Sequence, residues 1–134
     1  MLKSSTKEFL DLKSPLSLVR EMRDNDYNQF SSELWTEMVE MGWTALTVPE
    51  SYNGLDFGFI GLGQILEEAG KNLSKSPLIS SILLGASTLR LSDNEALKVR
   101  SFPGVMEGTS QFAFAIQEGK HHQIASFKTH AVLE

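Results

Sequence analysis

The sequence predicts a mostly α-helical protein, an up-and-down helical bundle with a short β segment at the C-terminus. Over residues 1–101, apolar side chains recur at helical spacing behind recognisable helix-start signals. From residue 111 the pattern changes, because Gln111–Ile116 and Ile124–Leu133 are rich in aromatic or β-branched residues and read as strands. Two strands alone are only marginally stable in water. We therefore expect a helical domain over 1–110 and the start of a truncated β domain over 111–134.

The first three helices are predicted from their start signals. These are the capping box Ser5–Glu8, the pair Ser14-Pro15, and Ser32 before the helix Glu33–Met41. Gly42 stands where a left-handed residue commonly follows a helix. The apolar run Trp43–Val48 is expected to be extended because Pro49 follows it.

The stretch VPESYNGLDFG, residues 48–58, is long and aromatic for a connection between two helices. Asn53-Gly54 predicts a turn, since both residues tolerate positive φ. Tyr52 and Phe57 should pack against the bundle or cover a local core. We expect an ordered loop here, with Trp43 and Tyr52 mostly buried.

Three further helices are predicted after this loop. Residues 59–70 are amphipathic, and Ser76-Pro77 starts a helix Leu78–Leu91 that is apolar on most faces and should be central. A capping box at Ser92–Glu95 starts a short helix over 93–101, which Pro103-Gly104 is expected to end.

Composition limits the possible functions. The formal net charge is −5, from 17 acidic and 12 basic residues, and no basic stripe suited to nucleic acid is present. The absence of cysteine excludes disulfides and thiolate sites. No apolar stretch is long enough for a membrane span or a signal peptide, so we expect a soluble, cytoplasmic protein. His121, His122 and His130 have no clustered acidic partners, and no metal site is expected.

Two segments carry a resemblance to a known family. Residues 34–70 contain Gly42-Trp43, Val48-Pro49-Glu50-Ser51-Tyr52, Gly54-Leu55 and Glu67-Glu68-Ala69-Gly70, and residues 92–118 follow with SDNEALKVRSFPGVMEGTSQFAFAIQE. In this order they resemble the N-terminal helical domain of the acyl-CoA dehydrogenases and the step into the middle β domain. Asn53 replaces the first glycine of the family's Gly-Gly pair.

The resemblance implies a FAD-dependent oxidoreductase that introduces a 2,3 double bond into acyl-CoA thioesters. In the family the catalytic carboxylate comes from a C-terminal helical domain, so no catalytic residue is expected in this chain. Glu67 and Glu68 are not expected to replace that carboxylate, because paired acids near the end of a helix are more often solvated or capping groups than catalytic ones. The chain alone is expected to be inactive and colourless.

The resemblance also suggests binding residues. The helix 78–91 would line the acyl-chain cavity through Leu83, Leu84 and Ala86, although each is also an ordinary core candidate. The flavin would be faced by Phe114, Ile116, Gln117 and His122. Here His121-His122-Gln123 stands where the family has Gly-Ser-Asp, and histidine does not permit the close backbone approach that glycine allows.

Two classes of function therefore remain open. The first is the N-terminal part of a FAD-dependent acyl-CoA dehydrogenase. The second is a non-catalytic partner subunit or interaction module with a degenerate flavin loop. Unpaired strand edges after residue 111 favour self-association or a family-like partner subunit. The acyl-chain length is not indicated by the sequence.

Overall fold

The computed structural model describes residues 1–25, 30–119 and 127–132. Its α-helices are α1 (Leu2–Lys13), α2 (Leu16–Asp24), α3 (Ser32–Glu40), α4 (Gly58–Lys71), α5 (Ser87–Leu91) and α6 (Glu95–Met106). Two 3₁₀ turns, η1 (Trp43–Ala45) and η2 (Glu50–Tyr52), and a π-helical stretch, η3 (Leu78–Ala86), complete the elements. The mostly helical class is confirmed.

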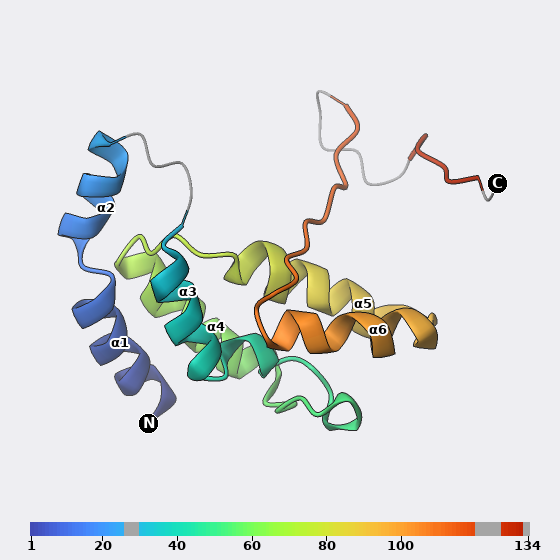
Figure 1. Cartoon of the computed structure of the whole chain (residues 1–134), viewed down its shortest axis with the longest axis horizontal. Coiled ribbons are helices and arrows are strands. Elements are labelled where there is room, and N and C mark those ends of the chain that lie inside the picture. Colours follow the sequence, from blue (N-terminus) through green and yellow to red (C-terminus); the bar gives the residue numbers. More distant parts are fainter. Residues whose placement is uncertain (26–29, 120–126, 133–134) are drawn as a thin grey trace.

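The helices form a bundle in which α1 packs along α4, and η3 runs directly into α5 to make one rod beside α6 (Figure 1). At one end of the bundle, α2 buries none of its residues. The segment after α6 crosses η3 and then leaves the helices (Figure 1).

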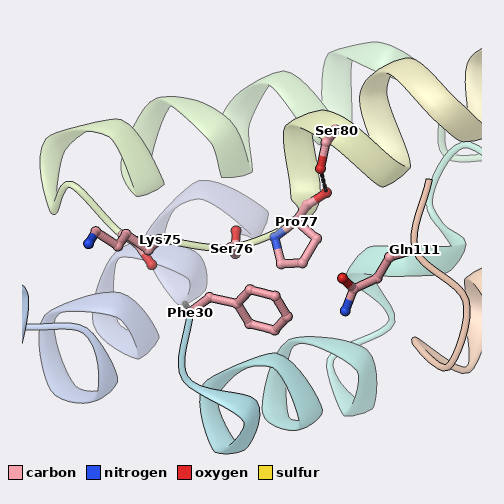
Figure 2. A pocket seen from close by; sticks show the side chains of 7 residues that line it. Phe30, Lys75, Ser76, Pro77, Ser80 and Gln111 are labelled. Atoms are coloured by element: carbon pink, nitrogen blue, oxygen red, sulfur yellow. Dashed lines mark hydrogen bonds between the residues drawn. The ribbon is translucent and has the colours of Figure 1, made fainter. Parts of the chain in front are cut away.

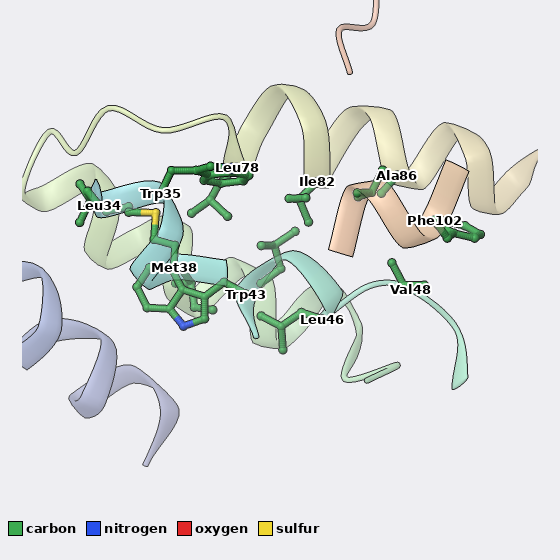
Figure 3. Close-up of a cluster of buried hydrophobic side chains, with 14 of the residues drawn as sticks. Leu34, Trp35, Met38, Trp43, Leu46, Val48, Leu78, Ile82, Ala86 and Phe102 are labelled. Atoms are coloured by element: carbon green, nitrogen blue, oxygen red, sulfur yellow. The ribbon is translucent and has the colours of Figure 1, made fainter. Parts of the chain in front are cut away.

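Apolar side chains from η1, η3 and all the described α-helices except α2 meet in one core (Figure 3). Its largest members with almost no exposed surface are Trp43, Phe102, Leu10, Met38, Leu62, Ile65, Leu78 and Ile82. The predicted burial of Trp43 is confirmed at 1% exposure. The Phe9 ring packs edge-on against Trp43 with centroids 5.2 Å apart, which attaches α1 to this core.

Several helix starts differ from the predicted ones. Ser5 lies inside α1, where its hydroxyl donates to the Leu2 carbonyl at 2.9 Å instead of capping. In α3 the cap is Ser31, whose Oγ accepts from the Leu34 N–H at 3.1 Å. In α6 it is Asn94, whose Oδ1 accepts from the Leu97 N–H at 3.0 Å. Neighbouring residues of similar capping ability make these positions ambiguous from sequence.

Two other local predictions are wrong. The run Trp43–Val48 is not extended, because Thr44 is buried and donates to the Met106 carbonyl at 2.6 Å from within a 3₁₀ turn. The last helix does not stop before Pro103 but continues to Met106. Pro103 removes one helical hydrogen bond, yet the burial of Phe102 and Val105 on either side keeps the helix together.

The loop 48–58 is ordered, as predicted, and its backbone is held against the bundle. Gly54 fits where no side chain can, because an added Cβ would lie 2.0 Å from the Val48 carbonyl oxygen. Asn53 adopts the left-handed conformation with φ 64°. Asp56 accepts from Arg90 at 2.7 Å, which connects the loop to α5.

Tyr52 is half-buried, less than predicted. Its ring lies 4.9 Å from that of Phe102, and its hydroxyl donates to Glu95 at 2.6 Å. The hydrogen bond to the Glu95 carboxylate raises the pKa of Tyr52, and desolvation adds to this effect.

Tyr52→Phe is expected to lower the free energy of unfolding slightly at pH 7, because the hydrogen bond to Glu95 is lost. A raised pKa means that this bond contributes fully below the tyrosine's unfolded pKa of about 10 and is lost as pH rises through the folded value. Urea denaturation at several pH values should therefore show the two proteins converging at alkaline pH. A difference that persists unchanged there would contradict this assignment.

The predicted strand Gln111–Ile116 is not formed: no strand occurs in 1–25, 30–119 or 127–132. A strand needs the backbone of a partner, and this segment instead bonds to a helix, where the Phe112 N–H donates to the Ser81 Oγ at 2.9 Å. Of the second predicted strand, residues 127–132 are irregular, and 124–126 and 133 lie outside the described residues.

Candidate functional site

The candidate site is the outer face of η3, where the segment after α6 crosses it. The Ser81 hydroxyl donates to the Phe112 carbonyl at 3.2 Å and accepts from the Phe112 N–H. One turn on, Gly85 allows close approach, since an added Cβ would lie 2.4 Å from the Phe112 Cβ. Two small residues of η3 thus hold the chain close at Phe112.

The three predicted acyl-chain residues point in different directions from η3. Leu84 is 40% exposed, Leu83 is partly buried against the core, and Ala86 is 2% exposed and belongs to the core. Leu83 and Leu84 thus offer apolar surface to a ligand, whereas Ala86 packs inside. Ile79, not singled out from the sequence, is also exposed on η3, at 57%.

The winding of η3 contributes to this distribution. Nine residues, Leu78–Ala86, are π-helical, although π-helix usually occurs as single-turn bulges and often at functional sites. A wider turn rotates each successive side chain by less than the α-helical 100°. The sequence contains no signal that would have revealed this.

A cavity of about 370 Å³ opens at the beginning of η3 (Figure 2). Figure 2 shows Phe30, Pro77 and Gln111 converging on it from three separate segments. The described residues that line it are Phe30, Ser74, Lys75, Ser76, Pro77, Ser80 and Gln111. The Ser80 hydroxyl donates to the Pro77 carbonyl at 3.3 Å.

The cavity combines one aromatic wall with hydroxyl, amide and ammonium groups. Ser74 Oγ is buried and makes no hydrogen bond with the part of the chain that is described. Among the described residues that line it, there is neither a carboxylate nor a histidine that could act as a general base. Its chemistry is therefore suited to binding a ligand with both apolar and hydrogen-bonding parts.

The predicted flavin-facing residues lie on one segment beyond this cavity. Phe114 is 44% exposed, Ile116 is half-buried, and the exposed Gln117 donates from Nε2 to the Gly119 carbonyl at 3.1 Å. His122 lies outside the described residues. The three described side chains thus come from a single irregular segment of the chain.

Next to these residues, Glu118 ties the segment to a later part of the chain. Its carboxylate accepts from the backbone N–H groups of Lys128 at 2.6 Å and Thr129 at 2.9 Å. Hydrogen bonds from the Thr129 side chain and from both backbone groups lower the pKa of Glu118. This carboxylate is therefore held ionised as a structural acceptor.

The paired acids of α4 are engaged by lysines. Lys3 donates to Glu67 at 2.7 Å, which joins α1 to α4. Within α4, Lys71 donates to Glu68 at 2.7 Å. The hydrogen bond from Lys3, followed by that from Lys71, lowers the pKa of Glu67. Glu68 is 2% exposed, which the sequence did not predict.

Comparison with known proteins agrees with this architecture. The family model described as acyl-CoA dehydrogenase, N-terminal domain, matches residues 1–109. The chain belongs to the acyl-CoA dehydrogenase family. The resemblance to the N-terminal helical domain is confirmed over residues 34–70 and 92–109, and the matching part of this family member is that helical domain.

Among curated proteins, this family member is similar to the acyl-CoA dehydrogenases FadE12 of Mycobacterium tuberculosis and fadE12 of Mycobacterium bovis. Each is 28% identical over 92 residues, which cover 68% of this chain and 24% of the relative. The chain thus matches about a quarter of the length of these relatives. No solved structure is significantly similar to it.

Neither a membrane-spanning helix nor a metal-binding cluster occurs in residues 1–25, 30–119 and 127–132. None of their helices has the length and apolarity needed to cross a bilayer. They also contain no group of three His, Cys, Asp or Glu side chains arranged to hold a metal ion, a result that leaves out His121 and His122.

Proposed function

We propose that this chain is the N-terminal part of a FAD-dependent acyl-CoA dehydrogenase and that it supplies acyl-chain-facing and flavin-facing surface to that enzyme. The observation that supports this most directly is the outer face of η3 in a chain whose residues 1–109 match the family. There, exposed Leu84 lies on the element that Phe112 crosses, and a cavity of about 370 Å³ opens at the beginning of the same element.

In this proposal the acyl chain of an acyl-CoA contacts Leu83 and Leu84. Burying their remaining exposed apolar area provides the binding energy, at about 25 cal/mol per Å². The polar lining at the start of η3, with Ser80 and Gln111, accommodates the more polar part of the ligand or bound water.

The flavin-facing part of the proposal is Phe114, Ile116, Gln117 and His122, with the remaining walls of the FAD site supplied by other parts of the enzyme. When bound, FAD would supply the acceptor for the hydride. The residues of this chain would contribute surface rather than a catalytic base. We place the protein in the cytoplasm.

The acyl-chain part is tested by titrating the chain with octanoyl-CoA and, separately, with CoA, while amide signals are followed by two-dimensional NMR. We expect octanoyl-CoA, but not CoA, to shift the signals of Leu83, Leu84 and Gln111. Leu84→Asp should weaken octanoyl-CoA binding roughly tenfold, because it removes apolar contact and places a charge against the acyl chain.

Leu91→Asp is the matched control, since Leu91 is an 84% exposed leucine at the far end of the same helical rod. It should leave the affinity unchanged. Equal binding of octanoyl-CoA and CoA, or equal effects of the two substitutions, would count against the proposal. That result would favour the alternative, a non-catalytic partner subunit or interaction module, which the unusual His121-His122-Gln123 sequence also favours.

A further inference from the structure

A second cavity lies between α2 and the residues that follow α4, and the proposed function does not use it. Its volume is about 420 Å³, within the range of small-molecule pockets. It is lined by Leu16, Val19, Arg20, Arg23, Leu73 and Lys75. Three of these side chains are apolar, three are cationic and none is acidic, although the whole chain has a formal net charge of −5.

Leu73 occupies an unusual backbone position beside this cavity. It directly follows α4 and its C-cap Asn72, and its φ is 51°, in the left-handed region where glycine is normally found. The turn is closed by backbone hydrogen bonds from the Leu73 N–H to the Gly70 carbonyl at 3.2 Å and from the Ser74 N–H to Ala69 at 2.9 Å. Leucine is strained in this backbone conformation, and its side chain, 62% exposed, forms part of the apolar wall of the cavity.

The cationic groups come mainly from α2. Arg23 pairs with its neighbour Asp24 at 2.7 Å, but both side chains are more than 60% exposed, so this pair contributes little and leaves other guanidinium N–H groups available. For Arg20 no ion pair is found with a described residue. Because α2 buries none of its residues, Leu16 and Val19 also keep apolar surface towards the cavity.

We propose that this cavity binds a free medium- or long-chain carboxylate. The hydrocarbon chain would lie against Leu16, Val19 and Leu73, while the carboxylate would accept hydrogen bonds from Arg20 and Arg23, as guanidinium groups favour. A bilayer surface fits less well, because α2 also carries Glu21 and Asp24, which an anionic membrane repels.

The test uses the 134-residue chain and sodium dodecanoate, with dodecyltrimethylammonium as a ligand of similar tail length and opposite charge. Calorimetry should show saturable binding of dodecanoate only, and amide NMR should show shifts in α2 and residues 73–75. Arg20→Gln should weaken binding about tenfold through loss of a charged hydrogen bond, and Arg20→Lys should recover part of it.

Leu73→Gly gives a second test. Weaker binding by this variant would not result from misfolding, because glycine suits the left-handed backbone better than leucine. It should weaken dodecanoate binding roughly fivefold by removing apolar wall, while the unfolding midpoint is unchanged or higher. Arg100→Gln, an exposed arginine on α6, is the control and should have no effect.

Several results would overturn the inference. These are equal binding of the cationic ligand, shifts confined to η3, or dodecanoate affinity unaffected by both Arg20→Gln and Leu73→Gly. Sedimentation of the chain with phosphatidylglycerol vesicles but not phosphatidylcholine vesicles, without saturable dodecanoate binding, would identify a membrane surface instead. The two cavities share Lys75, so only shifts in α2 and the effects of the Arg20 and Leu73 variants assign dodecanoate to the second cavity, and the effect of Leu84→Asp on octanoyl-CoA tests the proposed function separately.

Discussion

Gly54→Ala is expected to destabilise the protein severely, by about 3 kcal/mol, at the upper end of the cost of overpacking. The added Cβ would lie 2.0 Å from the Val48 carbonyl oxygen and 2.6 Å from the Val48 Cβ. Val48 is completely buried in the core, so the backbone cannot move away without opening the loop. Urea denaturation followed by circular dichroism would measure the change.

Gly63→Ala is the matched control. Gly63 is exposed in the middle of α4, and an added Cβ there would meet nothing within 4 Å. Alanine at this site should stabilise the helix by about 0.5–1 kcal/mol. If the two alanine variants had equal stability, the close packing of Gly54 against Val48 would not be the reason for glycine in this loop.

This loop was among the better predictions from sequence because its signals are local. Asn53-Gly54 and Gly42 require particular backbone conformations, and these are visible in the sequence without knowledge of the fold. Tyr52 was harder, since its environment depends on Glu95 and Phe102, which come from a helix far along the chain. Local chemistry predicted the turn, and tertiary contacts determined how deeply Tyr52 is buried.

The C-terminal segment shows the opposite case. The composition of residues 111–116 favours a strand, but strand formation depends on a partner backbone that local sequence does not specify. In the structure the Ser81 hydroxyl supplies the hydrogen bonds to Phe112. A serine in an apolar helix gave no sign of this role.

The candidate site was predicted only in part, and the reason lies in helical winding. An apolar helix over 78–91 was predicted correctly, but the π-helical geometry of Leu78–Ala86 was not. Which of Leu83, Leu84 and Ala86 is accessible depends on that geometry, so sequence spacing alone did not separate the exposed leucine from the buried alanine. The cavity under α2 was missed because it requires Leu73 and Arg20 to be neighbours in space.

Phe102→Ala is expected to lower the free energy of unfolding by about 3–5 kcal/mol, the usual cost of removing a buried aromatic ring. Phe102 has no exposed surface and packs against Tyr52, with the ring centroids 4.9 Å apart. Its removal leaves a cavity and weakens α6 next to Pro103, where the helix already lacks one backbone hydrogen bond. Thermal and urea unfolding would measure the loss.

The same substitution should also loosen the loop 48–58, because Phe102 supports the ring of Tyr52. Amide hydrogen exchange is therefore expected to accelerate at residues 52–56 in Phe102→Ala more than in α1, which lies away from this contact. Phe59→Ala is the control: Phe59 is 50% exposed on α4, so its truncation should cost far less. If Phe102→Ala and Phe59→Ala lowered the free energy of unfolding equally, burial of Phe102 would not explain why α6 continues through Pro103. Another contact of α6, such as the hydrogen bond from Thr44 to Met106, would then have to hold the helix.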